Sequence, residues 1–75
     1  MTIAQDVGAK VRGLRFRNRW TLDKLAANIG IGTEALRQRE YGKRDFTLDE
    51  LAKIGDIFGT DWRSLVPNKS ANTDL

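Results

Sequence analysis

The sequence predicts an all-α domain of five helices without a β-sheet. Apolar residues recur at intervals of three and four, as they do on the buried face of a helix. Thr or Asp residues precede these runs at positions that cap helices, and glycines follow two of them, where helices commonly end. With one Pro and 31% charged residues, the composition is that of a globular, helical chain.

Composition also excludes several classes of function. The 75 residues suffice for one small domain, near the lower size at which a chain folds alone. Because the chain has no Cys and no His, it lacks disulfides, thiolate or imidazole metal sites, and nucleophile–imidazole catalysis. We therefore expect no enzyme, no catalytic residue, no metal and no cofactor. No apolar run approaches the roughly 20 residues of a membrane span, and the N-terminal stretch is too polar for a signal peptide, so we expect a cytoplasmic protein.

The first helix is expected to begin at Thr2, because Thr2 and Gln5 have the spacing of a capping box. It should end near Asn18, in a basic stretch that the helix dipole favours. Gly8 and Gly13 each destabilise a helix by up to about 1 kcal/mol relative to Ala, so we expect them to mark the close approach of a neighbouring helix. The apolar face is expected to consist of Ile3, Val7, Val11 and Leu14.

The central stretch predicts two short helices joined by a tight turn. Thr21 can cap the first of them, and Gly30 can end it with a positive φ. The second should begin near Gly32 or Thr33 and carry Leu36 inward. The first helix places four apolar residues on one face: Leu22, Leu25, Ala26 and Ile29. A short helix, a glycine turn and a helix with long polar side chains form the pattern of a helix-turn-helix motif.

The fourth predicted helix opens at a second capping box, formed by Thr47 and Glu50, and ends at Gly59. Its buried stripe is expected to consist of Leu48, Leu51, Ile54, Gly55 and Phe58. These signals predict an amphipathic helix that packs on the motif.

The fifth predicted helix is one short turn, residues 62–66, with Asp61 as its cap and Pro67 as its stop. We expect residues 1–66 to form the folded domain. Residues 67–75 carry no pattern and are expected to form a polar, flexible tail.

Positive charge is concentrated in the part of the chain that contains the motif. Residues 1–44 hold ten Lys or Arg and four Asp or Glu, whereas residues 45–75 hold three and six. This is the distribution expected of a protein that docks on phosphate. A basic surface that serves only solubility is the simpler alternative.

These features resemble the Cro/repressor-type helix-turn-helix family, often called XRE-like, of phage and bacterial regulators. The resemblance extends from about Val7 to Val66. The matching positions are Leu25-Ala26, Gly30-Ile31, Leu36, Glu40 and Gly42-Lys43-Arg44. The resemblance implies a compact five-helix bundle of the lambda-repressor-like type, and a bacterial or phage-encoded DNA-binding protein.

By this resemblance, the second motif helix, about Thr33–Arg39, lies in the major groove of DNA and reads bases from its N-terminal end. Arg37 could donate two hydrogen bonds to guanine, and Glu34 could accept from cytosine. The Thr33 methyl could touch thymine, or its hydroxyl could contact a phosphate. The implied base-reading residues are Thr33, Glu34, Arg37 and Gln38. For Glu34 and Gln38, a solvated helix surface is the alternative.

The resemblance also implies residues that contact phosphate, namely Thr21, Tyr41, Lys43 and Arg44. Three positions depart from the family pattern. Leu22 stands where the family commonly has a Gln that reaches phosphate, which removes one anchoring contact. Arg19 replaces a common Gly, so the exit from the first helix should be strained. Arg39 replaces an apolar residue, and we expect its stem to cover the core while its charged head reaches solvent. A slight rotation of the helix is the alternative.

Two further sets of residues are expected to have structural roles. Arg15 and Glu40 match family positions that form an ion pair between the first helix and the end of the recognition helix. Ile57, Trp62 and Leu65 are the candidates for a dimer interface. A short final turn can bury only part of Trp62 and Leu65, and Ile57 lies beside Phe58 rather than on the buried face of its helix. For Trp62, closure of the core is the alternative.

The sequence thus predicts a sequence-specific regulator of double-stranded DNA, acting as a repressor and as a homodimer on a palindromic operator. No membrane and no small-molecule ligand is expected. A controller protein of a restriction-modification system and an antitoxin remain alternatives within the same fold. A protein-interaction module that does not read DNA is the alternative of a different class, favoured by Leu22 and Glu34.

Overall fold

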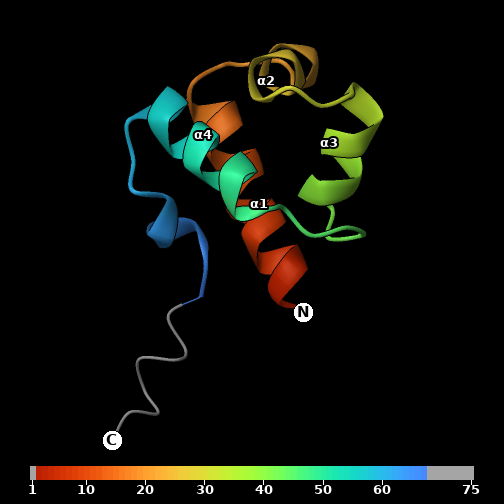
Figure 1. The fold of residues 1–75 in the computed structure, drawn as a ribbon, viewed down its shortest axis with the longest axis vertical. Helices are drawn as coiled ribbons and strands as arrows, with labels where there is room; N and C mark the ends of the chain where they lie inside the picture. Colours follow the sequence, from red (N-terminus) through yellow and green to blue (C-terminus); the bar gives the residue numbers. More distant parts are fainter. Residues whose placement is uncertain (1, 68–75) are drawn as a thin grey trace, which may run out of the picture.

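The computed structural model describes residues 2–67, and the expected tail lies outside these residues except for Pro67. Within this range the chain forms four α-helices and one short 3-10 helix, and it contains no strand (Figure 1). The expected fifth helix, one short turn over residues 62–66, is a 3-10 helix that ends at Leu65. The elements are α1 (Ile3–Arg17), α2 (Leu22–Ile29), α3 (Thr33–Glu40), α4 (Leu48–Phe58) and η1 (Trp62–Leu65).

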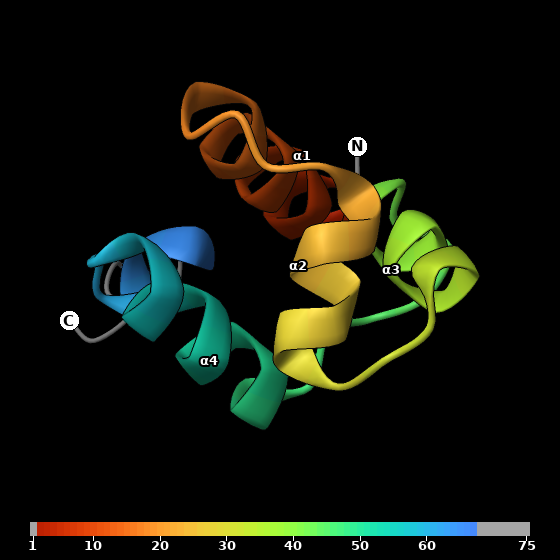
Figure 2. The same cartoon turned by 90° about the horizontal axis from the view of Figure 1, so that it is seen from above.

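The helices pack around α2 and α1. Seen from above, α2 lies between α3 and α4, and both contact it (Figure 2). The helix α1 packs against α3, and η1 packs against α1 and α4. None of the helices within residues 2–67 is long and apolar enough to cross a membrane.

The capping signals in the sequence are confirmed. Both capping boxes form: Thr2 with Gln5 opens α1, and Thr47 with Glu50 opens α4. Gly30 ends α2 with a φ of 81°. Such local signals involve residues within four positions of one another, so the sequence alone specifies them.

Two other local features are a positive φ angle at Arg19 and a capping carboxylate at Asp61. Arg19 adopts a φ of 60°, which places a side chain in the left-handed region that favours glycine. The strained exit from α1 is thus confirmed. Asp61 caps η1, and the hydrogen bond that the Arg63 amide donates to it lowers the pKa of the Asp61 carboxyl.

The buried core draws on every element of the fold. Its members are Val7, Val11, Leu25, Ala26, Ile29, Leu36, Leu51, Ile54 and Leu65. Leu14, Leu22 and Phe58 are half-buried against this core, whereas two other expected core residues are exposed: Ile3 is 61% exposed and Leu48 is 65% exposed. Each is the first residue of its helix, at an end of the bundle where its side chain is left open to solvent. Leu65 was expected at a dimer interface. It is instead only 3% exposed and belongs to the core of the single chain.

Only one of the two glycines of α1 marks a close helix contact. A Cβ atom at Gly8 would lie 2.3 Å from the backbone oxygen of Glu40, so α1 and α3 meet where only hydrogen fits. A Cβ atom at Gly13 would meet only the Arg17 side chain, at an ordinary 3.8 Å. The expectation for Gly13 was therefore wrong, because this position faces a gap rather than a helix.

Candidate nucleic-acid interface

The turn between α2 and α3 sets the direction of α3. The Ile31 amide donates to the Ala26 oxygen at 3.0 Å, and the Ile31 side chain packs against the core. On α3, Leu36 is completely buried. Because a helix has 3.6 residues per turn, burial of Leu36 turns Glu34 and Arg37 outward, and both are exposed.

The exposed face of α3 carries most of the predicted base-reading residues. Glu34 and Arg37 form an ion pair one turn apart. The amide oxygen of Gln38 accepts a hydrogen bond from Arg44 Nε at 3.0 Å. A shallow hollow of about 420 Å³ lies on this face, lined by Glu34, Arg37, Gln38, Tyr41 and Lys43. The structure therefore brings three predicted base-reading residues and two predicted phosphate-contacting residues to one surface.

Thr33 and Thr21 use their hydroxyl groups within the protein. Thr33 Oγ1 donates to Asp23 Oδ1 at 2.7 Å, which joins the first turns of α3 and α2. Thr21 Oγ1 accepts from the Lys24 amide at 3.1 Å as the cap of α2. The methyl group of Thr33 and the free amides of the first turn of α2 remain available to a ligand.

The loop that follows α3 carries the other cationic candidates. Lys43 and Arg44 are exposed. Gly42 has a φ of 78°, and a Cβ atom there would lie 2.7 Å from the Cα atom of Gln5, so the loop is pressed against the start of α1. The loop thus holds its cations on a backbone that glycine alone permits.

The buried ion pair between α1 and α3 is bidentate. Arg15 Nε lies 2.8 Å from Glu40 Oε2, and Arg15 Nη2 lies 3.0 Å from Glu40 Oε1. The remaining Arg15 nitrogen donates to the Trp20 oxygen at 3.1 Å. Glu40 is 1% exposed, so both charges are removed from water and satisfy one another. This pair fixes the C-terminal end of α3 on α1.

Arg39 and Arg12 make contacts that are not evident from the sequence. The Arg39 side chain is only 17% exposed, and its Nε lies 2.9 Å from Glu50 Oε1. The expectation that its head reaches solvent was wrong, because a buried carboxylate on α4 accepts it. Arg12 Nη1 donates to the Glu40 oxygen at 2.9 Å, and its guanidinium lies 4.8 Å from the centre of the Tyr41 ring. The sequence did contain a signal for the Arg39 contact, because Arg39 occupies a position that the family usually fills with an apolar residue.

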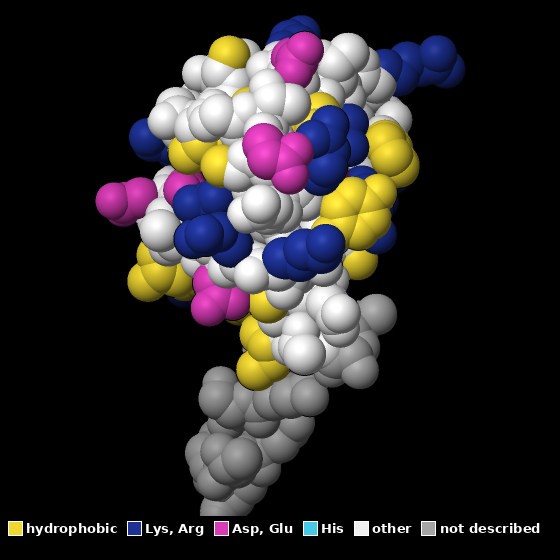
Figure 3. All heavy atoms as spheres, turned by 90° about the vertical axis from the view of Figure 1, so that its right-hand side faces the viewer, with side chains coloured by type: hydrophobic (Ala, Val, Ile, Leu, Met, Phe, Trp, Pro, Cys, Tyr) yellow, Lys and Arg dark blue, Asp and Glu magenta, His cyan; other side chains and the backbone are white. Residues whose placement is uncertain are grey.

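The side of the molecule formed by α3 shows the mixed charge of this surface. Basic side chains are spread over it, with acidic and apolar groups between them (Figure 3). The uneven charge of the sequence therefore appears in three dimensions as separate cations beside α3, not as an unbroken basic patch.

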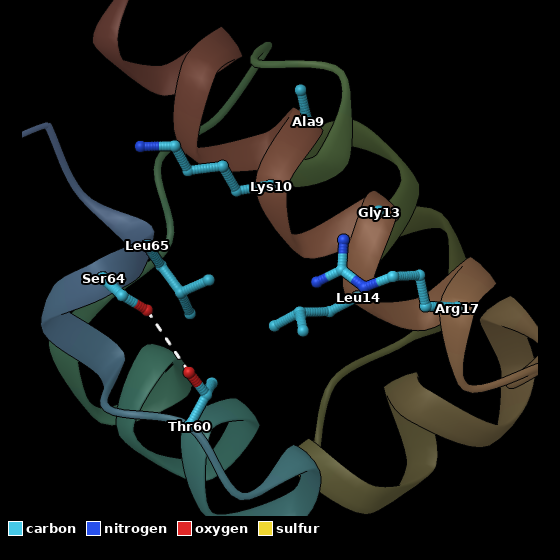
Figure 4. A pocket seen from close by; sticks show the side chains of 8 residues that line it. All are labelled: Ala9, Lys10, Gly13, Leu14, Arg17, Thr60, Ser64 and Leu65. Atoms are coloured by element: carbon cyan, nitrogen blue, oxygen red, sulfur yellow. Dashed lines mark hydrogen bonds between the residues drawn. The ribbon is translucent and has the colours of Figure 1, made fainter.

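A second hollow, of about 230 Å³, lies between α1 and the segment from Thr60 to Leu65 (Figure 4). Lys10 and Arg17 line it on the α1 side, and the Thr60 and Ser64 hydroxyls lie 3.4 Å apart on the other. No α3 residue belongs to this lining. Among residues 2–67, no group of three carboxylates could hold a metal ion.

Of the expected dimer residues, Ile57 lies in the last turn of α4, and Trp62 and Leu65 lie in η1. Ile57 and Trp62 are half-buried and pack against the core, whereas Leu65 is a full member of it. A different apolar surface is more open. A hollow of about 400 Å³ has apolar walls formed mainly by Ile3, Val7, Phe46, Leu48, Leu51 and Val66.

Comparison with known proteins places these features in a family. The family model described as helix-turn-helix matches residues 12–65. A crystal structure of the clp gene regulator ClgR from Corynebacterium glutamicum has a TM-score of 0.81 at 22% identity, covering 87% of this chain and 69% of that chain. A second ClgR crystal structure has a TM-score of 0.80 at 20% identity, covering 100% and 97%. The DNA-binding domain of BldD from S. venezulae has a TM-score of 0.73 at 25% identity, covering 87% and 97%.

No curated protein sequence gives a significant match. The solved structures show that the fold is shared with regulators. The family model spans the chain from the second half of α1 to the end of η1 and so includes α2, the Gly30 turn and α3. This protein therefore belongs to the Cro/XRE-type helix-turn-helix family.

Proposed function

We propose that this protein is a sequence-specific regulator of transcription that binds double-stranded DNA, with Thr33–Arg39 in the major groove. The observation that carries this proposal is the face of α3, where Arg37, Glu34 and Gln38 are accessible while Leu36 fixes the helix on the core. Arg37 suits guanine O6 and N7, Glu34 suits cytosine N4, and Gln38 suits adenine. The known BldD structure is that of a DNA-binding domain, which supports the same use of this fold.

Phosphate contacts would then come from both sides of α3. Lys43 and Arg44 are exposed on the loop after α3, and Tyr41 lies between them and the helix. Thr21 leaves the first-turn amides of α2 free, and such helix N-termini bind phosphate oxygens. We assign this activity to residues 1–66.

The direct test is a gel shift on the DNA immediately upstream of the gene that encodes this chain, with a scrambled duplex of equal length as control. A sequence-specific regulator that controls its own expression shifts the upstream duplex at a protein concentration at least about tenfold lower than the scrambled one. Equal binding to both duplexes would contradict specificity on this DNA.

A homodimer that represses transcription on a palindromic operator is the second part of the proposal. One α3 helix offers few base-reading side chains, and so few contacts rarely separate an operator from the non-specific sites of a genome. Two α3 helices about 34 Å apart would enter successive major grooves on one side of the duplex. A dimer would therefore supply the discrimination that a single subunit lacks.

Two apolar surfaces compete as the dimer contact. The first consists of Ile57 and Trp62, which are half-buried. Leu65 is buried in the core of the chain and is not available for this contact. The hollow beside Ile3 and Leu48 is the second, and these two residues are the more exposed ones. Ile57→Glu and Leu48→Glu form a matched pair of variants. Cooperative binding to a palindromic duplex should be lost in one of them and kept in the other, and unchanged cooperativity in both would exclude both surfaces.

A protein-interaction module, such as an antitoxin, is the second candidate function. Two observations favour it: Leu22 replaces a phosphate-reaching side chain, and Glu34 neutralises Arg37 on the free surface. This candidate predicts no binding to any duplex at about 50 mM salt, where phosphate contacts are strong.

A further inference from the structure

The loop between α3 and α4 spans residues 41–47 and presents Lys43 and Arg44 to solvent. Hydrogen bonds within it continue the turn of α3. The Gly42 amide donates to the Arg39 oxygen at 3.2 Å, and the Lys43 amide donates to the Gln38 oxygen at 2.9 Å. The backbone that carries these cations therefore begins as an extension of the recognition helix.

The two ends of this loop are joined by one side-chain cluster. Arg39, in the last turn of α3, donates to Glu50 Oε1 at 2.9 Å. The same oxygen accepts the Thr47 amide at 3.0 Å, while the Glu50 amide donates to Thr47 Oγ1 at 3.1 Å. Glu50 is thus both a member of the capping box of α4, whose N-cap is Thr47, and the partner of a cation on α3. We call Arg39, Glu50 and Thr47 the loop clamp.

The two charged side chains of the clamp, Arg39 and Glu50, are largely buried. Glu50 is 8% exposed and the Arg39 side chain is 17% exposed. A second Arg39 nitrogen donates to the Ala35 oxygen at 3.1 Å, which holds the guanidinium along its own helix. If Arg39 and Glu50 separated, each would be a partly buried charge with poor solvation. The hydrogen-bonded geometry of the pair is therefore favoured over any open arrangement. The clamp therefore restricts the distance between the loop ends.

We propose that Arg39 is a positioning residue for DNA binding. By pairing with Glu50 it closes the base of the loop and aims Lys43 and Arg44 at the phosphates beside the groove that α3 enters. This inference rests on the proposed function, because it assigns those cations to phosphate. It goes further in giving the orientation of the loop to a residue that itself touches no DNA.

The decisive variant is the double change Arg39→Met with Glu50→Met. It removes the ion pair but keeps the net charge of the protein, so long-range attraction to DNA is unaltered. Replacing both members of a buried pair by apolar residues usually preserves folding. The binding constant for a scrambled duplex is measured against salt, because log affinity falls by about 0.9 per contacted phosphate for each unit of log salt. If the clamp positions the loop, the double variant should have a shallower slope of log affinity against log salt, by the equivalent of about 1 to 2 phosphate contacts per subunit.

Two single variants serve as controls. Glu50→Gln keeps an oxygen that can accept from both Arg39 and Thr47, so it should retain most of the wild-type slope. Arg17→Met removes an exposed cation at the opposite end of α1, beside the hollow that lacks α3 residues, and should leave the slope unchanged. A folded double variant with the wild-type slope and affinity would overturn the proposal. A loss confined to the specific duplex would also overturn it, since this would be a fault in base reading.

A second measurement needs no DNA. Amide hydrogen exchange at Gly42 and Lys43 should be at least about tenfold faster in the double variant, because the loop opens locally. Exchange at Leu25, whose amide bonds to Thr21 within α2, should stay the same. Unchanged exchange at Gly42 and Lys43 would refute the clamp even if the protein binds DNA. Failure of the wild-type protein to bind any duplex, together with faster exchange in the variant, would instead refute the proposed function and leave the loop clamp as a purely structural device.

Discussion

Glu34 and Arg37 face each other across one turn of α3 and form an ion pair on its exposed side. The free protein therefore presents a cation that is already neutralised by its neighbour. DNA must either exchange this partner for a base edge or accept both groups together on one base pair. In both cases the acidic member opposes binding to phosphate alone, so the pair favours discrimination over affinity.

Arg37→Ala tests the base-reading half of this pair. We expect a loss on the order of 1–3 kcal/mol on the specific duplex, and a relaxed preference at one base pair. Competition binding with single-substituted duplexes measures both effects. Lys43→Ala is the control, because loss of a phosphate contact should weaken all sequences alike. An equal loss of binding to specific and scrambled DNA in Arg37→Ala would remove it from the base-reading residues.

Glu34→Gln tests the acidic half. Removing a negative charge beside the groove should raise affinity for scrambled DNA and reduce the ratio between specific and scrambled binding. Asp56→Asn makes the same change in charge at an exposed position of α4 and should leave this ratio unchanged. Both ratios come from titrations at one salt concentration. A ratio that rises in Glu34→Gln would show that the carboxylate does not discriminate.

The Arg15–Glu40 pair is expected to act as a structural unit. Arg15→Ala or Glu40→Ala alone should destabilise the fold by about 3–5 kcal/mol, because each leaves a buried charge without its partner. The double variant should lose less than the sum of the two single losses. Chemical denaturation of the three variants measures the free energies of unfolding. Additive losses would mean that the two side chains do not interact energetically.

Gly8→Ala and Gly13→Ala are a matched pair on one helix. A methyl group at Gly8 meets the Glu40 backbone at 2.3 Å, so α1 and α3 must separate, and we expect a loss of about 1–3 kcal/mol or more. A methyl group at Gly13 meets nothing closer than 3.8 Å and should stabilise the helix by up to about 1 kcal/mol. Thermal melts of the two variants should therefore shift in opposite directions, and a shift in the same direction would refute the assigned contact.

The caps at Thr2, Thr21 and Thr47 and the turn at Gly30 could be predicted, because each depends on residues that are neighbours in the sequence. Periodicity also identified Leu36 as the inward residue of α3. Periodicity failed at Leu48, because a spacing rule has no knowledge of where the bundle ends.

Contacts between distant residues were beyond such rules. The partner of Arg39 is eleven positions away on another helix, and its identity depends on how the loop returns the chain. The same holds for the two glycines of α1, which look alike in sequence but differ in what packs on them. Arg15 and Glu40 are separated by twenty-five positions, and the resemblance to a known family, not spacing, suggested their pairing.

We propose that the surface of α3 and the loop after it bind duplex DNA through several phosphates. The measurement that tests it most directly is the affinity of the unmodified protein for duplex DNA between about 50 and 200 mM salt. We predict a linear fall of log affinity with log salt, with a slope of about 0.9 per phosphate and at least roughly four contacts per subunit. A flat response, or no binding at about 50 mM salt, would contradict the claim.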